Sequence, residues 1–155
     1  MNKSKEFLSA MRGLTSSVTV ISSQTGDERR AMTASSVTSL SIDPPSMLVC
    51  VNKNASIYEI LGKDKLFCIN VLSTNQIDVA NLCSSSQDGE SRFSEGQWKS
   101  NKGIPYNHES SINIFCKCFD LYEHTSHSVF FGEVLEIFNN SSSVLLYGNG
   151  DYIKN

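Results

Sequence analysis

The sequence lacks any apolar run approaching the roughly 20 residues that span a bilayer as a helix. Its first residues, 1–14, have no apolar segment of the kind found in secretory signal peptides. Basic residues are not clustered beyond Arg29 and Arg30, and the formal net charge is −3. The lack of a long apolar run argues against a membrane protein. Because nucleic acids are bound through a concentrated basic face, the lack of a basic cluster argues against general nucleic-acid binding.

Paired metal-binding or redox cysteines are also missing. The five cysteines are an odd number and none forms Cys-x-x-Cys, which argues against a disulfide framework, a zinc site and a thioredoxin-type centre. Most of them lie in apolar runs, where cysteine usually packs as a small apolar residue. Reduced thiols predict a cytoplasmic protein. The three histidines, His108, His124 and His127, have no spacing that indicates a metal site.

Several catalytic signatures are absent. There is no Gly-x-Gly-x-x-Gly or P-loop, which argues against a Rossmann dehydrogenase and a P-loop enzyme. There is no Gly-x-Ser-x-Gly and no His-Glu-x-x-His, so a serine hydrolase of that type and a zinc protease are also disfavoured.

What is present predicts one domain over residues 1–155 that is mainly β. Apolar spacing predicts a helix over 4–14, a helix capped by Asn54, and a helix opened by a Ser73–Gln76 capping box. Strands are expected at 15–23, 30–34, 46–52, 66–72, 111–122, 128–138 and 144–147. The strand at 46–52 is expected to be buried on both faces, and Gly132 to mark a bulge or a close approach. Residues 84–105 are polar and are expected to form a long irregular loop. About seven strands without regularly interleaved helices favour an antiparallel barrel.

Residues 31–56 are the most informative segment, because small hydroxyl side chains crowd its first half. One interpretation is a solvated edge strand and turn. The other is a cradle for a flat polar ring and its phosphate, because small side chains let backbone groups approach a ligand and hydroxyls add donors. The expected helix start at Asn54–Ser56 would add free N–H groups for an anion.

The sequence resembles the flavin reductase-like family of FMN-binding split-barrel proteins, which includes the reductase components of two-component flavin monooxygenases of the 4-hydroxyphenylacetate 3-monooxygenase type. The resemblance begins at Met32–Pro45, Leu48–Asn52 and Ser56. It continues, in the family's order, through Phe67–Leu72, Gln76–Ala80, Arg92-Phe93 with Trp98, Gly103–Pro105, His127–Val134, Leu145–Tyr147 and Asp151-Tyr152. It implies an antiparallel Greek-key split β-barrel with a few short peripheral helices, assembled as a homodimer.

The resemblance also implies roles for individual residues. Flavin-binding residues would be Thr33, Ala34, Ser35 and Ser36 along the ring and ribityl chain, Cys50, Val51 and Asn52 behind it, Ser56 at the phosphate, Ala80 and Ser84 near the tail, and Arg92 and Phe93 closing the pocket. His127 would face the nicotinamide as the catalytic residue. Purely structural roles are the alternative: a helix cap for Ser56, a cover for the barrel mouth for Arg92, and packing for Phe93 and Cys50.

The implied activity is hydride transfer from NADH or NADPH to FMN or FAD, with reduced flavin passed to a partner monooxygenase. Two alternatives stay open. One is a flavin-binding electron carrier or non-catalytic flavin protein of the same fold, favoured by Thr125 and Ser126, which stand where the family often has Gly-Asp. The other is a β-barrel binding module without flavin, since a fold alone does not fix function.

Overall fold

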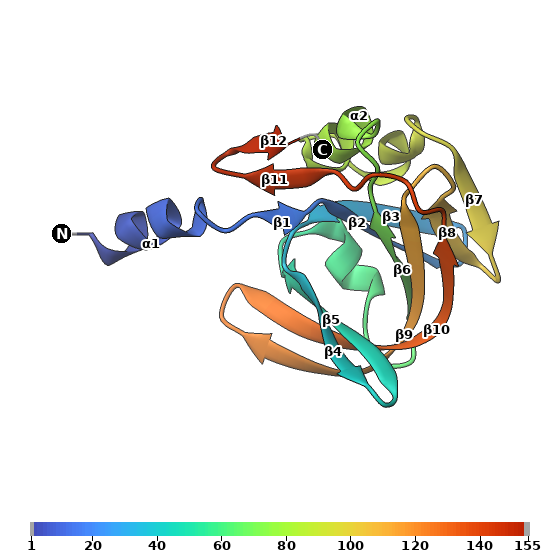
Figure 1. Ribbon diagram of the computed structural model, residues 1–155. Helices are drawn as coiled ribbons and strands as arrows, with labels where there is room; N and C mark the ends of the chain where they lie inside the picture. Colours follow the sequence, from blue (N-terminus) through green and yellow to red (C-terminus); the bar gives the residue numbers. More distant parts are fainter. Residues whose placement is uncertain (1, 154–155) are drawn as a thin grey trace.

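The structure is a computed structural model that describes residues 2–153. It is dominated by antiparallel strands (Figure 1). The elements in chain order are α1 Lys3–Met11, β1 Ser16–Ser17, β2 Thr19–Thr25, β3 Glu28–Ala34, β4 Val37–Ile42, β5 Pro45–Asn52, the 3₁₀ helix η1 Ser56–Ile60, β6 Leu66–Val71, α2 Ile77–Ser84, the 3₁₀ helix η2 Gly89–Phe93, β7 Trp98–Asn101, β8 Ile104–Asn107, β9 Ile112–His124, β10 His127–Asn139, β11 Leu146–Gly148 and β12 Asp151–Ile153.

The main sheet has seven strands in the order β3-β2-β6-β9-β10-β5-β4. Its two edge strands, β3 and β4, follow one another in the chain and are joined only by Ser35 and Ser36. A link this short spans only a few ångströms, so the sheet has to curl until its edges meet at this turn. The backbone N–H of Cys50 donates to the carbonyl of Ser36 at 3.0 Å, which fixes the turn to β5.

The curled sheet encloses an apolar core around the buried rings of Phe67 and Phe130. Phe115 packs in a separate cluster with Cys68 and Ile104. A second cluster under α2 includes Leu72 and Leu145. Two small sheets complete the fold: the β7–β8 hairpin, and a sheet in which β11 lies between β1 and β12. Helix α1 has no buried residue and extends away from the rest of the molecule (Figure 1).

Most expected elements are confirmed, including the N-terminal helix and the strands along the sheet. The strand register shifts between Phe131 and Gly132, which confirms the bulge expected there. A Cβ on Gly132 would lie 2.7 Å from Cζ of Phe67, so the close approach is also confirmed. At α2, Oε1 of Gln76 accepts from the N–H of Ser73 at 3.0 Å, which is the glutamine half of the capping box.

Three expectations are wrong. Residues 84–105 are not irregular throughout, because they contain η2, β7 and the start of β8. The hairpin β7–β8 turns through Lys102 and Gly103, both at positive φ, which matches the twist of paired strands. The helix expected after Asn54 begins at Ser56 without a side-chain cap. Its turn is set instead by Asn52, whose Oδ1 accepts from the N–H of Asn54 at 2.8 Å.

Strand β5 is the third correction. It was expected to be buried on both faces, but Leu48 and Cys50 are only half-buried. Val49 and Val51 point into the core. The face that carries Cys50 borders a pocket, which is why it is not covered by other side chains.

Candidate functional site

A pocket of about 230 Å³ lies at the turn where the edges of the sheet meet. The end of β3, the turn itself, the end of β5 and the start of β10 all contribute to it. Its lining consists of Met32, Thr33, Ala34, Ser35, Ser36, Cys50, Asn52 and His127. Three separate segments of the predicted site therefore meet at one place.

Strand pairing explains how His127 reaches this pocket. In the β5–β10 ladder His127 pairs with Asn52, and Val129 pairs with Cys50. His127 and Cys50 thus come to the same end of the sheet although they are far apart in the chain. The Nδ1 atom of His127 lies 2.8 Å from Oγ of Ser126 in a hydrogen bond. This contact restrains the exposed imidazole at the rim of the pocket.

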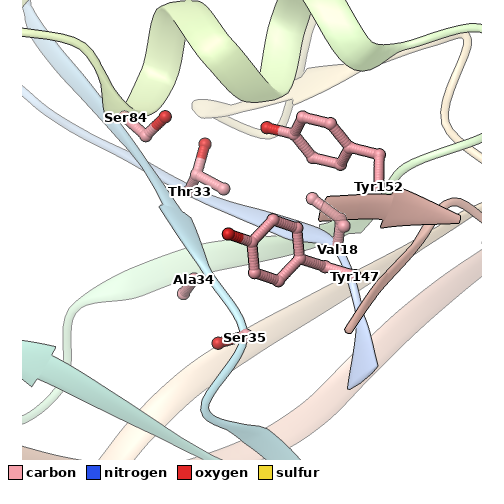
Figure 2. Close-up of a pocket in the computed structure, with 7 residues that line it drawn as sticks. All are labelled: Val18, Thr33, Ala34, Ser35, Ser84, Tyr147 and Tyr152. Carbon is pink, nitrogen blue, oxygen red and sulfur yellow. The ribbon is translucent and has the colours of Figure 1, made fainter. Parts of the chain in front are cut away.

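A second pocket of about 230 Å³ adjoins the first, and both include Thr33, Ala34 and Ser35. Figure 2 shows Tyr147 and Tyr152 extending from the C-terminal hairpin toward Thr33 and Ser84. The two tyrosine rings are in edge contact with centroids 5.4 Å apart.

The tyrosines of the second pocket were not among the predicted site residues. The hydroxyl of Tyr152 donates to Oδ1 of Asn81 at 2.7 Å, which links the hairpin to α2. A sequence signal for their placement existed. Asn149-Gly150 is a strong turn for a two-residue hairpin, and such a turn sets Tyr147 opposite Tyr152.

Five predicted residues do not line either of these pockets: Val51, Ser56, Ala80, Arg92 and Phe93. Val51 and Ala80 are fully buried. Phe93 is 7% exposed and contacts Trp98 at a centroid distance of 4.7 Å, with the guanidinium of Arg29 over its ring. Direct contact of these side chains with a flavin stays a prediction.

Arg92 is also outside both pockets, and its guanidinium donates to backbone carbonyls. It donates to the carbonyls of Ala31 at 2.8 Å, Ser85 at 2.9 Å and Gln87 at 2.7 Å. These bonds fasten the loop after α2 to the open edge of β3. Arg92 therefore holds the loop after α2 in place beside β3.

Ser56 lies apart from the two pockets and has a partner of its own. Its Oγ donates to Oδ1 of Asp88 at 2.7 Å. Burial alone would raise the pKa of Asp88. Hydrogen bonds from Ser56 and Gly89 and the charges of Arg92 and Arg30 outweigh it and hold that pKa below its usual value. The carboxylate of Asp88 is consequently ionised at neutral pH.

The cysteines divide into one accessible thiol and four buried ones. Cys50 is half-buried at the pocket, whereas Cys68, Cys83, Cys116 and Cys118 are buried. Burial raises the pKa of Cys83 to about 11 and of Cys116 to about 12. In the described part of the chain, no three His, Cys, Asp or Glu side chains are grouped in a way that could hold a metal ion. No helix between residues 2 and 153 has the length and apolar character needed to span a membrane.

The pocket at the sheet edges is lined mainly by small and uncharged polar side chains. Its lining offers hydroxyls, an amide, an imidazole and a thiol, with no carboxylate or lysine. Small side chains at Ala34, Ser35 and Ser36 leave backbone groups accessible to a ligand. A site of this composition fits the isoalloxazine ring of a flavin, for which a protein supplies binding and orientation while the cofactor supplies the chemistry.

Comparison with known proteins places the chain in a family. Residues 11–154 match the family model for the flavin reductase like domain. The reductase component of the FADH₂-dependent resorcinol hydroxylase of a Rhizobium species is 34% identical over 152 residues, covering 96% of this chain and 85% of that protein. The NADH-dependent FMN reductase RutF of Pseudomonas syringae is 31% identical, covering 88% of this chain and 78% of that protein.

A solved structure shows the same arrangement of elements. The NADH:FAD oxidoreductase SgcE6 of Streptomyces globisporus, in complex with NAD and FAD fragments, superposes with a TM-score of 0.90 at 25% identity. The alignment covers 99% of this chain and 93% of that one. The chain belongs to the flavin reductase-like family.

Proposed function

We propose that this protein is an NAD(P)H-dependent flavin reductase that transfers hydride from NADH or NADPH to FMN or FAD. The observation that carries the proposal is the convergence of Ser35, Cys50 and His127, from three distant segments, on one pocket without charged side chains. The names of the relatives support it. One is an NADH-dependent FMN reductase, one is an NADH:FAD oxidoreductase in complex with NAD and FAD fragments, and one is the reductase component of an FADH₂-dependent hydroxylase.

Within this proposal, the flavin ring and ribityl chain lie along Thr33, Ala34, Ser35 and Ser36, with Cys50, Val51 and Asn52 behind the ring. Ser56 faces the phosphate, and Ala80 and Ser84 lie near the tail. Because Val51 and Ala80 are fully buried, they contribute backbone rather than side chains. Arg92 and Phe93 close the pocket by holding the loop after α2 against β3.

The flavin, when bound, supplies the hydride-accepting chemistry. The residues around it bind and orient. Backbone and hydroxyl donors along the turn at Ser35 and Ser36 stabilise negative charge that develops on a reduced ring. His127, restrained by Ser126, would hold the nicotinamide against the flavin, because hydride transfer needs the reacting atoms to approach within about 3–3.5 Å. We assign no obligatory proton transfer to His127.

The proposal extends to fold and assembly. The curled sheet with its edges joined at Ser35-Ser36 is consistent with a Greek-key split barrel that forms a single domain. A homodimer is supported by exposed apolar side chains on α1, where Phe7 is 60% and Leu8 is 65% exposed. A cytoplasmic location and a flavin-dependent monooxygenase partner complete the proposal; the Rhizobium relative is the reductase component of such a hydroxylase.

A flavin-binding electron carrier of the same fold is the second candidate, favoured by Thr125-Ser126 before His127. One experiment separates the two. Purified protein is mixed with NADH or NADPH, with and without added FMN or FAD, and nucleotide oxidation is followed by absorbance. Flavin-dependent oxidation over many turnovers is expected. A flavin complex seen in the visible spectrum but without turnover would establish the carrier, and no flavin spectrum would refute both candidates.

A further inference from the structure

The carboxylate of Asp88 lies where hydrogen-bond donors and positively charged side chains converge. Its Oδ1 atom accepts hydrogen bonds from Oγ of Ser56 and from the backbone N–H of Gly89, both at 2.7 Å. The same oxygen lies 3.7 Å from Nε of Arg92. Arg30 adds positive charge from β3, since the ideal Cβ position of Gly89 is 4.0 Å from its Nη1.

The neighbouring carboxylates pair with other arginines, whereas Asp88 is the carboxylate that faces Arg92. Glu90 forms an ion pair with Arg29, and Glu28 pairs with Arg30. The guanidinium of Arg92 is fixed by backbone carbonyls, which are neutral, so Asp88 is the carboxylate nearest to its charge. An anion at this position would be favourable even if it did not come from the protein.

The position lies on the flank of β3. Its donors are Ser56 of η1 and Gly89 of η2. Arg92, also in η2, donates to the carbonyl of Ala31 in β3. Ala31 is two residues before Thr33, which lines both pockets. A ligand whose ring rests at Ser35 and whose chain runs back along β3 would bring its far end toward Ser56.

We propose that Asp88 determines specificity for the phosphorylated end of the flavin. This inference rests on the proposed function. Its carboxylate holds the anion position that Ser56 offers, and a flavin phosphate binds there only by displacing it. The terminal phosphate of FMN carries close to two negative charges at neutral pH, whereas each phosphate of FAD carries one. Asp88 therefore disfavours FMN more than FAD and leaves riboflavin unaffected.

The test compares the variant Asp88→Asn with the unaltered protein. Asparagine keeps an oxygen for the Ser56 and Gly89 donors and removes only the charge. Dissociation constants of riboflavin, FMN and FAD are measured by flavin fluorescence at low and high salt. We expect FMN affinity to rise roughly threefold to tenfold at low salt, FAD affinity to rise less, and riboflavin affinity to stay the same. Glu90→Gln, an equal charge change in the 3₁₀ helix that Asp88 caps, is the matched control and is expected to change the FMN-to-riboflavin ratio less than Asp88→Asn.

Each other outcome has a defined meaning. An unchanged FMN-to-riboflavin affinity ratio in Asp88→Asn would overturn the role of Asp88 while leaving the flavin reductase proposal intact. An equal change for all three flavins, or an equal effect of Glu90→Gln, would overturn it too, because the charge would not be acting on the phosphate at this position. If the unaltered protein bound none of the flavins, the proposed function would fail first, and this inference with it.

Discussion

Thr33 donates a hydrogen bond from Oγ1 to the backbone carbonyl of Ala80 at 2.7 Å, which ties the edge strand β3 to α2. Ser84 donates to the same carbonyl at 2.9 Å. Three predicted flavin-binding residues thus meet at a single oxygen. Since the Thr33 proton is committed to Ala80, the hydroxyl can offer a ligand only its lone pairs.

Replacing Thr33 with valine removes this tie. We expect Thr33→Val to lower the free energy of unfolding by about 1 kcal/mol, the usual net value of one such bond. Thr33→Ser, which keeps the hydroxyl, should cost less. Urea unfolding measures both, with Thr38→Val on the exposed face of β4 as the control that should be nearly neutral. A Thr33→Val protein as stable as the control would mean that Ser84 alone satisfies the carbonyl.

Cys50 gives a chemical probe of the pocket. It is half-buried in the lining while the other four cysteines are buried. In the native protein, we expect a thiol reagent to modify Cys50 first, with the rest reacting only after unfolding. Bound FMN should slow this reaction severalfold, and a bulky adduct should block flavin binding. Mass spectrometry of digested protein identifies the site. Equal labelling rates with and without saturating FMN would contradict a flavin position next to Cys50.

Replacing His127 distinguishes flavin binding from the rate of flavin reduction. We expect His127→Ala to lower kcat for flavin reduction roughly tenfold while changing the dissociation constant of FMN by less than about threefold, because its assigned role is to orient the nicotinamide. The matched control is His124→Ala. His124 pairs with His127 across the β9–β10 turn but is absent from the pocket lining. Steady-state kinetics and a flavin titration give the two quantities, and equal losses in both variants would argue that the turn, not the imidazole, matters.

The strands and the turn at Ser35 could be predicted from the sequence, because alternating apolar residues and clusters of hydroxyl residues are patterns within a few neighbouring positions. They could not reveal that Ser56 is bonded to Asp88, which lies 32 residues away on another element. The three carbonyl partners of Arg92 could not be predicted for the same reason, because a side chain that donates to a backbone carbonyl does not depend on which residue supplies that carbonyl. The β7–β8 hairpin was missed because both strands have only four residues and β7 is mostly polar, although Lys102-Gly103 predicted the turn.

Gly132 tests the packing behind the site. An added Cβ would lie 2.7 Å from Cζ of Phe67 and 2.9 Å from Cβ of Cys116, and both neighbours are buried in the core. We expect Gly132→Ala to destabilise the protein by about 1–3 kcal/mol through overpacking. Gly62→Ala is the control, because a Cβ there has no neighbour within 4 Å. Urea midpoints compare the two, and equal stability would show that β10 shifts freely at its bulge.

The buried thiols predict how stability depends on alkaline pH. The folded-state pKa is about 11 for Cys83 and about 12 for Cys116, whereas an unfolded thiol has a pKa of roughly 8.5. Because folding keeps these thiols neutral, their contribution is fully present below the unfolded value. Above it, the unfolded chain releases protons that the folded chain retains, and stability falls by up to about 1.4 kcal/mol per pH unit for each thiol.

The Cys83 contribution is lost over the window from roughly pH 8.5 to 11, and the Cys116 contribution continues to fall toward pH 12. Guanidinium unfolding at a series of pH values measures the slope. We expect Cys83→Ala to reduce it. A slope that is identical in the variant and in the unaltered protein would mean that Cys83 ionises in the folded state as readily as in the unfolded chain, and that water reaches the space under α2.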